Sequence, residues 1–244
     1  MRWHSSFTPG ALAKQASAIS ALILGALVLT ACQTAPAIKP PVALAPLPPL
    51  PVQGTTHYTI RADLSDLRFL VYRAGPLASF GHNHVIRATQ MQGDIYFGQD
   101  LQHSGFTLTL PVKDFQVDAP QARAVEGPDF AEQPSAQAIQ GTYNNMLGAS
   151  ELDAAQYPDI RIRSVGFAGP EWQPDATVRI ELHGVQRDLT VPIVLERHDK
   201  QLIASGAFQI KQSDFGIRPF SILGGGLQVA DTVKVSFHLV AQSD

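Results

Sequence analysis

The sequence predicts an all-β fold of antiparallel strands, and three observations support this class. Apolar and polar residues alternate in short runs through most of residues 55–244, which is the period of a strand that buries one face. Short turn sequences such as GVQRD, HDKQ and PEWQPDA separate these runs. Strands with one apolar face need a closed sheet or a second sheet to cover that face. We therefore expect a barrel or a sandwich.

Each predicted strand places its apolar residues at every second position. In the first, HYTIRAD, Tyr58 and Ile60 share a face. The later runs with the same pattern are TLTLPV (107–112), DIRIRS (159–164), TVRIELHG (177–184), LTVPIVLER (189–197) and KVSFHLV (234–240). Residues 131–157 interrupt the alternation and are rich in Ala, Gln, Leu and Met, so we expect a helical insertion there.

Residues 1–31 have the layout of a secretory signal peptide. Arg2 and Lys14 form a positive flank without acids, and the apolar run that follows ends at small residues before Cys32. A core of about 15 residues is shorter than the roughly 20 that a transmembrane helix needs. The residues LTAC (29–32) resemble a bacterial lipobox, so we expect Cys32, the only cysteine of the chain, to carry covalent lipid.

Such an anchor predicts a location on the periplasmic side of a bacterial membrane, and Gln33, where an aspartate would favour the inner membrane, favours the outer one. Residues 32–54 contain seven prolines, which predicts a semi-rigid tether after the anchor. The remaining residues 55–244 have a suitable length for one domain. A net charge of −3 without a run of like charges argues against a nucleic-acid partner.

Three motifs in this domain resemble the YceI-like family. They are ELDAAQYPDIRIRS (151–164), LHGVQRDLTVPI (182–193) and SDFGI (213–217), and they occur in the order and spacing of that family. The resemblance extends over residues 57–242. It implies a lipocalin-like antiparallel β-barrel of about eight strands around an elongated apolar channel. It also implies that the channel binds a polyisoprenoid, such as a prenylated quinone or a polyprenyl lipid, and that the protein is not an enzyme.

The alternating apolar residues of the predicted strands are expected to line this channel and contact the lipid. The residues assigned to the lining are Phe69, Val71, Leu108, Leu110, Ile162, Ile180, Leu182, Phe208, Phe237 and Leu239. The sequence departs from the family pattern at TYNNMLGASELD (142–153), and SFGHNHVIR (79–87) contains one histidine more than usual.

His82 and His84 are the most conspicuous polar candidates, because residues i and i+2 of a strand point to the same face and both imidazoles could reach one metal ion. His183, His103, Asp100 or Asp94 would have to complete such a site, and no fixed metal-site spacing accompanies them. We favour an imidazole that packs inside the barrel and hydrogen-bonds a buried polar group. A third interpretation is that His84 binds the polar head of the lipid.

Arg218 in SDFGIRP is a further polar candidate for the pocket. The sequence as a whole predicts a membrane-anchored lipid-binding protein, with no cofactor beyond the bound isoprenoid and the acyl groups on Cys32. Two alternatives stay open: a metal-binding protein or hydrolase that uses His82, His84 and His183, and a structural envelope barrel without ligand. The sequence is also compatible with a homodimer.

Overall fold

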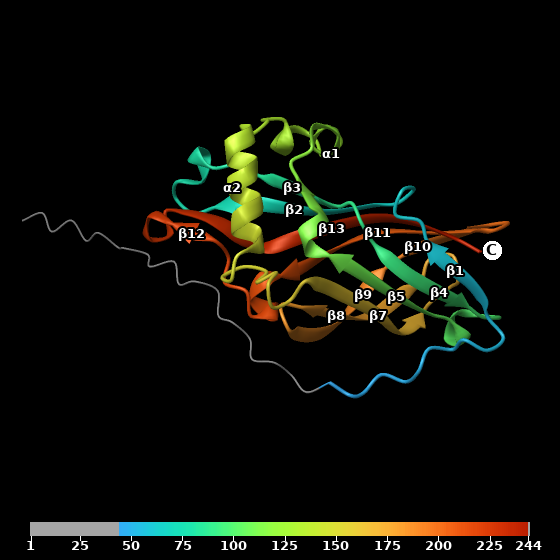
Figure 1. Cartoon of the computed structure of the whole chain (residues 1–244). Helices are drawn as coiled ribbons and strands as arrows, with labels where there is room; N and C mark the ends of the chain where they lie inside the picture. The colour runs from blue at the N-terminus through green and yellow to red at the C-terminus, as the bar shows by residue number, and fades with distance from the viewer. Residues whose placement is uncertain (1–43, 244) are drawn as a thin grey trace, which may run out of the picture. The chain divides into compact units, whose positions relative to one another are not determined.

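The computed structural model describes residues 44–243, and antiparallel strands account for most of them (Figure 1). The predicted signal peptide, Cys32 and the first part of the predicted tether lie outside the described residues. The strands are β1 (Thr56–Ile60), β2 (Asp66–Ala74), β3 (His84–Ala88), β4 (Gln92–Phe97), β5 (Gly105–Pro111), β6 (Phe115–Val117), β7 (Asp159–Ala168), β8 (Asp175–Leu182), β9 (Val185–Pro192), β10 (Val194–His198), β11 (Gln201–Lys211), β12 (Ser221–Ile222) and β13 (Leu227–Gln242).

All thirteen strands belong to one sheet, whose main path runs β6-β3-β2-β13-β1-β4-β5-β7-β8-β9. The sheet branches at the sixteen-residue strand β13, which pairs with β2 and then β1 along one side and with β11 along the other. β10 pairs with β11, and only Ile193 separates it from the end of β9.

The expectation of an antiparallel all-β fold is confirmed, but the simple closed barrel of about eight strands is not what the structure shows. The sheet is open, with β6 and β9 at the two ends of its path. The difference arises at β13, which is long enough to pair with several strands and has a register shift between Val229 and Val233. The alternation in the sequence reports strands and their faces but not how many partners each strand has.

The hairpin between β8 and β9 shows how local sequence sets the register. Leu182 pairs with Val185, so His183 and Gly184 form a two-residue loop, and both have positive φ values, 53° and 70°. Two such residues give the turn that matches the twist of the flanking strands. Gly184 also lies against the ring of Tyr157, where a Cβ would stand 2.6 Å from Cε1.

Two α-helices lie among the described residues: α1 (Pro120–Ala124), which contacts β3, and α2 (Ala136–Leu147), which contacts β6. α2 falls inside the predicted helical insertion. The Oγ of Ser135 caps it by accepting a hydrogen bond from the backbone N–H of Ala138 at 3.2 Å. None of the helices within residues 44–243 has both the length and the hydropathy to cross a bilayer.

The described part of the predicted tether, residues 44–54, contains no helix or strand and contacts the outer side of the sheet. Arg179 of β8 donates from Nη1 to the carbonyl oxygen of Ala45 at 2.6 Å. Arg163 of β7 donates to the carbonyl oxygen of Pro48. This portion of the tether therefore packs against the domain.

Candidate functional site

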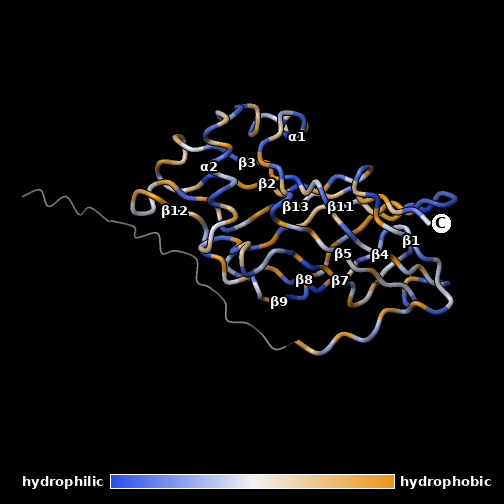
Figure 2. The backbone as a smooth tube through the Cα atoms, viewed as in Figure 1, coloured by the Kyte–Doolittle hydropathy of each residue, from blue (hydrophilic) through white to orange (hydrophobic). Residues whose placement is uncertain are grey.

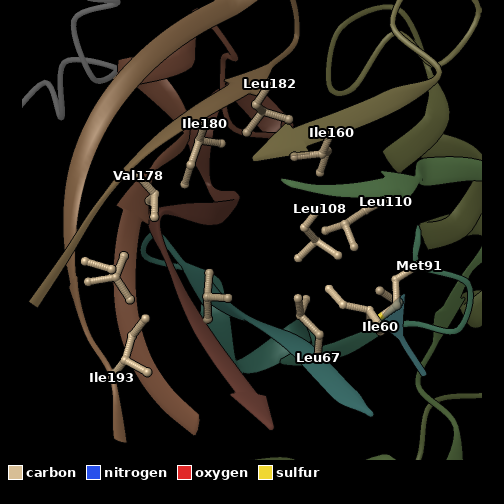
Figure 3. Close-up of a cluster of buried hydrophobic side chains, with 14 of the residues drawn as sticks. Ile60, Leu67, Met91, Leu108, Leu110, Ile160, Val178, Ile180, Leu182 and Ile193 are labelled. Carbon is tan, nitrogen blue, oxygen red and sulfur yellow. The ribbon is translucent and has the colours of Figure 1, made fainter. Parts of the chain in front are cut away.

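The curved sheet encloses a cavity of about 320 Å³. Every strand except β12 contributes at least one lining residue, and most of these residues are apolar. Figure 3 shows part of this interior, where Leu108 and Leu110 of β5 and Ile180 of β8 point toward a common space. A deep apolar cavity with few polar groups is the usual form of a site for an apolar small molecule.

All ten apolar residues that were assigned to the channel line this cavity in the structure. They are Phe69, Val71, Leu108, Leu110, Ile162, Ile180, Leu182, Phe208, Phe237 and Leu239. Their common orientation follows from the strand period, because residues two apart share a face. That they contact a ligand stays a prediction.

Six polar side chains interrupt the apolar lining: His84, Ser104, Thr142, Asn145, Glu151 and Gln212. Thr142 and Asn145 come from α2 and Glu151 from the segment that follows it. The sequence analysis did not place these three in the site. They lie in the insertion, where no strand period indicates which side chains turn toward the cavity.

His84 belongs to a buried polar cluster at the start of β3. Its Nδ1 lies 2.6 Å from Oδ2 of Asp118, a side chain with no exposed surface. The other carboxylate oxygen, Oδ1, accepts the backbone N–H of Val85 at 2.9 Å and a hydrogen bond from Arg123. Arg123 is only 3 % exposed and also donates from Nη1 to the carbonyl oxygen of Asn83 at 2.7 Å.

The contacts of Asp118 determine its charge. Burial by itself would raise the pKa of this carboxyl group, but hydrogen bonds from His84, from the Val85 N–H and from Arg123, together with the charge of His84, hold the pKa below its usual value. Asp118 is therefore ionised at neutral pH. An ionised carboxylate only accepts hydrogen bonds, so Nδ1 of His84 must carry the proton of the bond between them. Nε2 is then the nitrogen that can meet a molecule in the cavity.

The other polar candidates from the sequence lie elsewhere. His82 is not a lining residue, and its Nδ1 lies 3.3 Å from a carboxylate oxygen of Glu132. The rings of His82 and His84 are neighbours, with centroids 6.4 Å apart, but each has a different acidic partner. Arg218 is exposed and is not a lining residue.

The histidines proposed for a metal site do not come together in the structure. His183 lies in the turn between β8 and β9, where its Nδ1 is 3.4 Å from the carbonyl oxygen of Phe215 and its ring packs against Tyr157. His103 bonds Asp100 at 2.7 Å on the surface. Within residues 44–243, no three His, Cys, Asp or Glu side chains are arranged to hold a metal ion.

Asp118 and Arg123 are the residues that the sequence analysis missed. Asp118 comes directly after β6 and has a positive φ of 54°, and Arg123 lies in the short helix α1. Neither belongs to a motif with a recognisable spacing to His84. The only available signal for them was their position beside short apolar segments. Aspartate and arginine at such positions are more often exposed than buried.

Comparisons with known proteins agree with this architecture. The family model of the YceI-like domain matches residues 58–241. The solved structure of BcnA from Burkholderia cenocepacia has a TM-score of 0.55 at 16% identity, covering 75% of this chain and 99% of that one. A polyisoprenoid binding domain from Saccharophagus degradans has a TM-score of 0.53 at 13% identity, covering 78% and 99%. No curated protein matches the chain.

At such low identities the two solved structures show a shared fold and no more. The family model, in contrast, extends over most of the described residues, from β1 to the end of β13. The protein therefore belongs to the YceI-like family.

Proposed function

We propose that this protein binds a long-chain isoprenoid, such as a prenylated quinone or a polyprenyl lipid, in the cavity. The observation that carries the proposal is the lining itself, which is apolar on almost every strand. Burial of an apolar chain is worth about 25 cal/mol per Å², so a tail of several isoprene units has a large driving force to enter. The similarity in fold to the polyisoprenoid binding domain from Saccharophagus degradans supports the same ligand class.

His84 is the group that we assign to the head of the lipid. Its Nδ1–H is held by Asp118, which leaves Nε2 for the ligand. Nε2 accepts a hydrogen bond from an O–H when the ring is neutral and donates one to a carbonyl oxygen when the ring is charged. His84→Phe removes both possibilities and should weaken the binding of a prenylated quinone or quinol.

The membrane anchor belongs to this proposal as well. A lipid on Cys32 and the tether that follows it would keep the cavity close to a bacterial membrane on its periplasmic side, where isoprenoid lipids are located. Two or more acyl chains give stable attachment, because each buried CH₂ contributes about 0.8 kcal/mol. The tether contacts of Arg163 and Arg179 with the backbone of Pro48 and Ala45 would limit how far the domain can move from the anchor.

Lipid extraction from the purified full-length chain, followed by mass spectrometry, tests the proposal. Phe208 lines the cavity, whereas Gln209, the next residue of β11, is exposed on the opposite face. Phe208→Lys should therefore lower the amount of bound isoprenoid at least about tenfold, since an unpaired charge in an apolar site costs more than the 1.4 kcal/mol that corresponds to a factor of ten. Gln209→Lys introduces the same charge outside the cavity and should leave the amount unchanged.

Ala204→Trp provides a second test that adds no charge. Ala204 lines the cavity, and an indole there would occupy space that the lipid needs. Circular dichroism would establish that each variant is folded. Absence of isoprenoid from the wild type, or equal amounts in all four proteins, would refute the proposed ligand.

A further inference from the structure

Two loops that are distant in the sequence form one projecting surface, which we call the apolar tip. It consists of residues 75–81, after β2, and residues 221–226, which include β12 and the turn before β13. The backbone N–H of Leu77 donates to the carbonyl oxygen of Gly226 at 2.8 Å. The contact is so close that a Cβ on Gly75 would stand 2.6 Å from the same oxygen. The two loops are therefore packed backbone to backbone.

Large apolar side chains of the tip face solvent. Phe80 is 78% exposed, Leu223 71%, Ile222 43% and Leu77 37%. In Figure 2 the segment around β12 is in part coloured as hydrophobic. Leu223 also has a positive φ of 53°, a conformation that a bulky residue rarely adopts. A group of exposed apolar side chains on a strained turn indicates an interaction site.

The charged side chains within the tip segments and their continuations have one sign, whereas Glu132 and Asp129 lie beside the neighbouring residues His82 and Asn83. Residues 73–81 and 216–229 contain no aspartate or glutamate, and their only charged side chains are Arg73 and Arg218. Both arginines are exposed. An apolar surface flanked by cations matches the boundary of a bilayer that contains anionic lipids, where apolar side chains enter the acyl region and cations remain among the head groups.

The tip also adjoins the cavity. At the base of β12 the N–H of Val229 donates to the carbonyl oxygen of Phe220 at 2.9 Å, and both residues line the cavity. In the two strands that flank the other loop, Val71 of β2 and His84 of β3 are ladder partners and also line the cavity. The tip therefore lies at the end of the cavity that contains His84.

We propose that the apolar tip docks into the surface of a lipid bilayer and places the His84 end of the cavity against the membrane. The inference rests on the proposed function, because it gives the route by which a membrane lipid would enter. A second copy of the chain is a poorer occupant, since a stable protein interface involves roughly 20–30 residues a side. Binding to a membrane surface, in contrast, needs only a few apolar side chains with flanking cations.

Tryptophan fluorescence with brominated lipids tests the docking. The chain contains two tryptophans, Trp3 and Trp172. Trp172 is 65% exposed in the turn between β7 and β8, so it is a matched aromatic reporter outside the tip. The full-length chain with Trp3→Phe, Trp172→Phe and Phe80→Trp would be combined with vesicles of brominated phosphatidylcholine and phosphatidylglycerol in equal parts. The control protein carries only Trp3→Phe and so retains Trp172.

We expect the brominated lipid to quench most of the Phe80→Trp emission and to leave that of Trp172 nearly unchanged. Ile222→Trp, in the same background, should be quenched as Phe80→Trp is. Equal quenching of tip and control reporters, or no quenching of either, would overturn the docking. The docking would also be overturned if the tip reporters were not quenched and the protein instead formed a dimer through the tip.

One further variant separates docking from ligand binding. In a Phe208→Lys background the cavity should no longer bind lipid, but quenching of the Phe80→Trp reporter should persist. If quenching disappears there, the brominated phospholipid was in the cavity and the docking is refuted, while isoprenoid extracted from the wild type still supports the proposed function. If the tip is quenched but no isoprenoid is extracted from the wild type, the docking stands and the proposed function fails.

Discussion

Removal of the Asp118 carboxylate should destabilise the protein more than removal of an acid on the surface. Asp118 has no exposed surface and Arg123 is only 3 % exposed. Asp118→Ala would leave the guanidinium buried without its counter-ion, a change that typically costs about 3–5 kcal/mol. Arg123 retains hydrogen bonds to the carbonyl oxygens of Asn83 and Glu132, so the lower end of that range applies.

The backbone adds a second contribution. The N–H of Val85 loses its acceptor, and alanine is less suited than aspartate to the positive φ of 54° at this position. These effects add about 1 kcal/mol, which brings the expected loss in the free energy of unfolding to about 4 kcal/mol. With a urea m-value of about 2 kcal/mol/M, the unfolding midpoint should fall by about 2 M.

Urea titration followed by circular dichroism measures this shift. Asp63, whose side chain is 61% exposed and pairs with Arg61, is the control, and Asp63→Ala should leave the midpoint almost unchanged. The double variant Asp118→Ala, Arg123→Leu should be no less stable than Asp118→Ala alone, because the second change removes the orphaned charge. The reasoning is wrong if Asp118→Ala behaves like Asp63→Ala, or if the double variant loses the sum of the two single effects.

Three further predictions follow from individual contacts. Because the pKa of Asp118 is lower in the folded protein than the ordinary value of 3.8, its ionised form stabilises the fold above that pH, and this stabilisation is lost as the pH falls through the folded pKa. In urea titrations at different pH, the wild type should therefore lose stability more steeply below pH 3.8 than Asp118→Asn does; equal slopes would contradict the assigned charge. Gly206→Ala should lower the melting temperature, since a Cβ would stand 2.5 Å from the carbonyl oxygen of Pro192. Gly141→Ala, in α2 with open space around it, should instead stabilise the protein by about 0.5–1 kcal/mol, and the same sign for both changes would argue against this packing. Ser135→Ala should cost about 1 kcal/mol in thermal unfolding through loss of the α2 cap; no loss would show that the cap is dispensable.

The face that each strand turns toward the cavity could be predicted from the sequence. Side-chain direction in a strand is a local property with a period of two, so Leu108 and Leu110 had to share a face, as did Phe237 and Leu239. The helical insertion was predictable for the same reason, because α2 lies where the alternation stops. Membership in the YceI-like family was also evident from three short motifs in register, and the family model confirms it.

The pairing of the strands was decided by the tertiary structure. The sequence does not show that β13 pairs with strands on both sides, and the expected closed barrel proved to be an open thirteen-stranded sheet. Pairing depends on which apolar faces meet after the chain has folded back over long distances. A local period contains no information on that choice.

The chemistry of the site also has one part that the sequence predicts and another that depends on the tertiary structure. By itself, the sequence determined that the interior is apolar and that a histidine enters it, because both follow from residue type and spacing within one strand. Only the tertiary structure decided that His84 bonds Asp118, which is 34 residues away, and that Leu77 meets Gly226 to form the apolar tip. A hydrogen bond between distant residues requires a fixed register of the strands that hold them, and that register is set by the packing of the whole sheet.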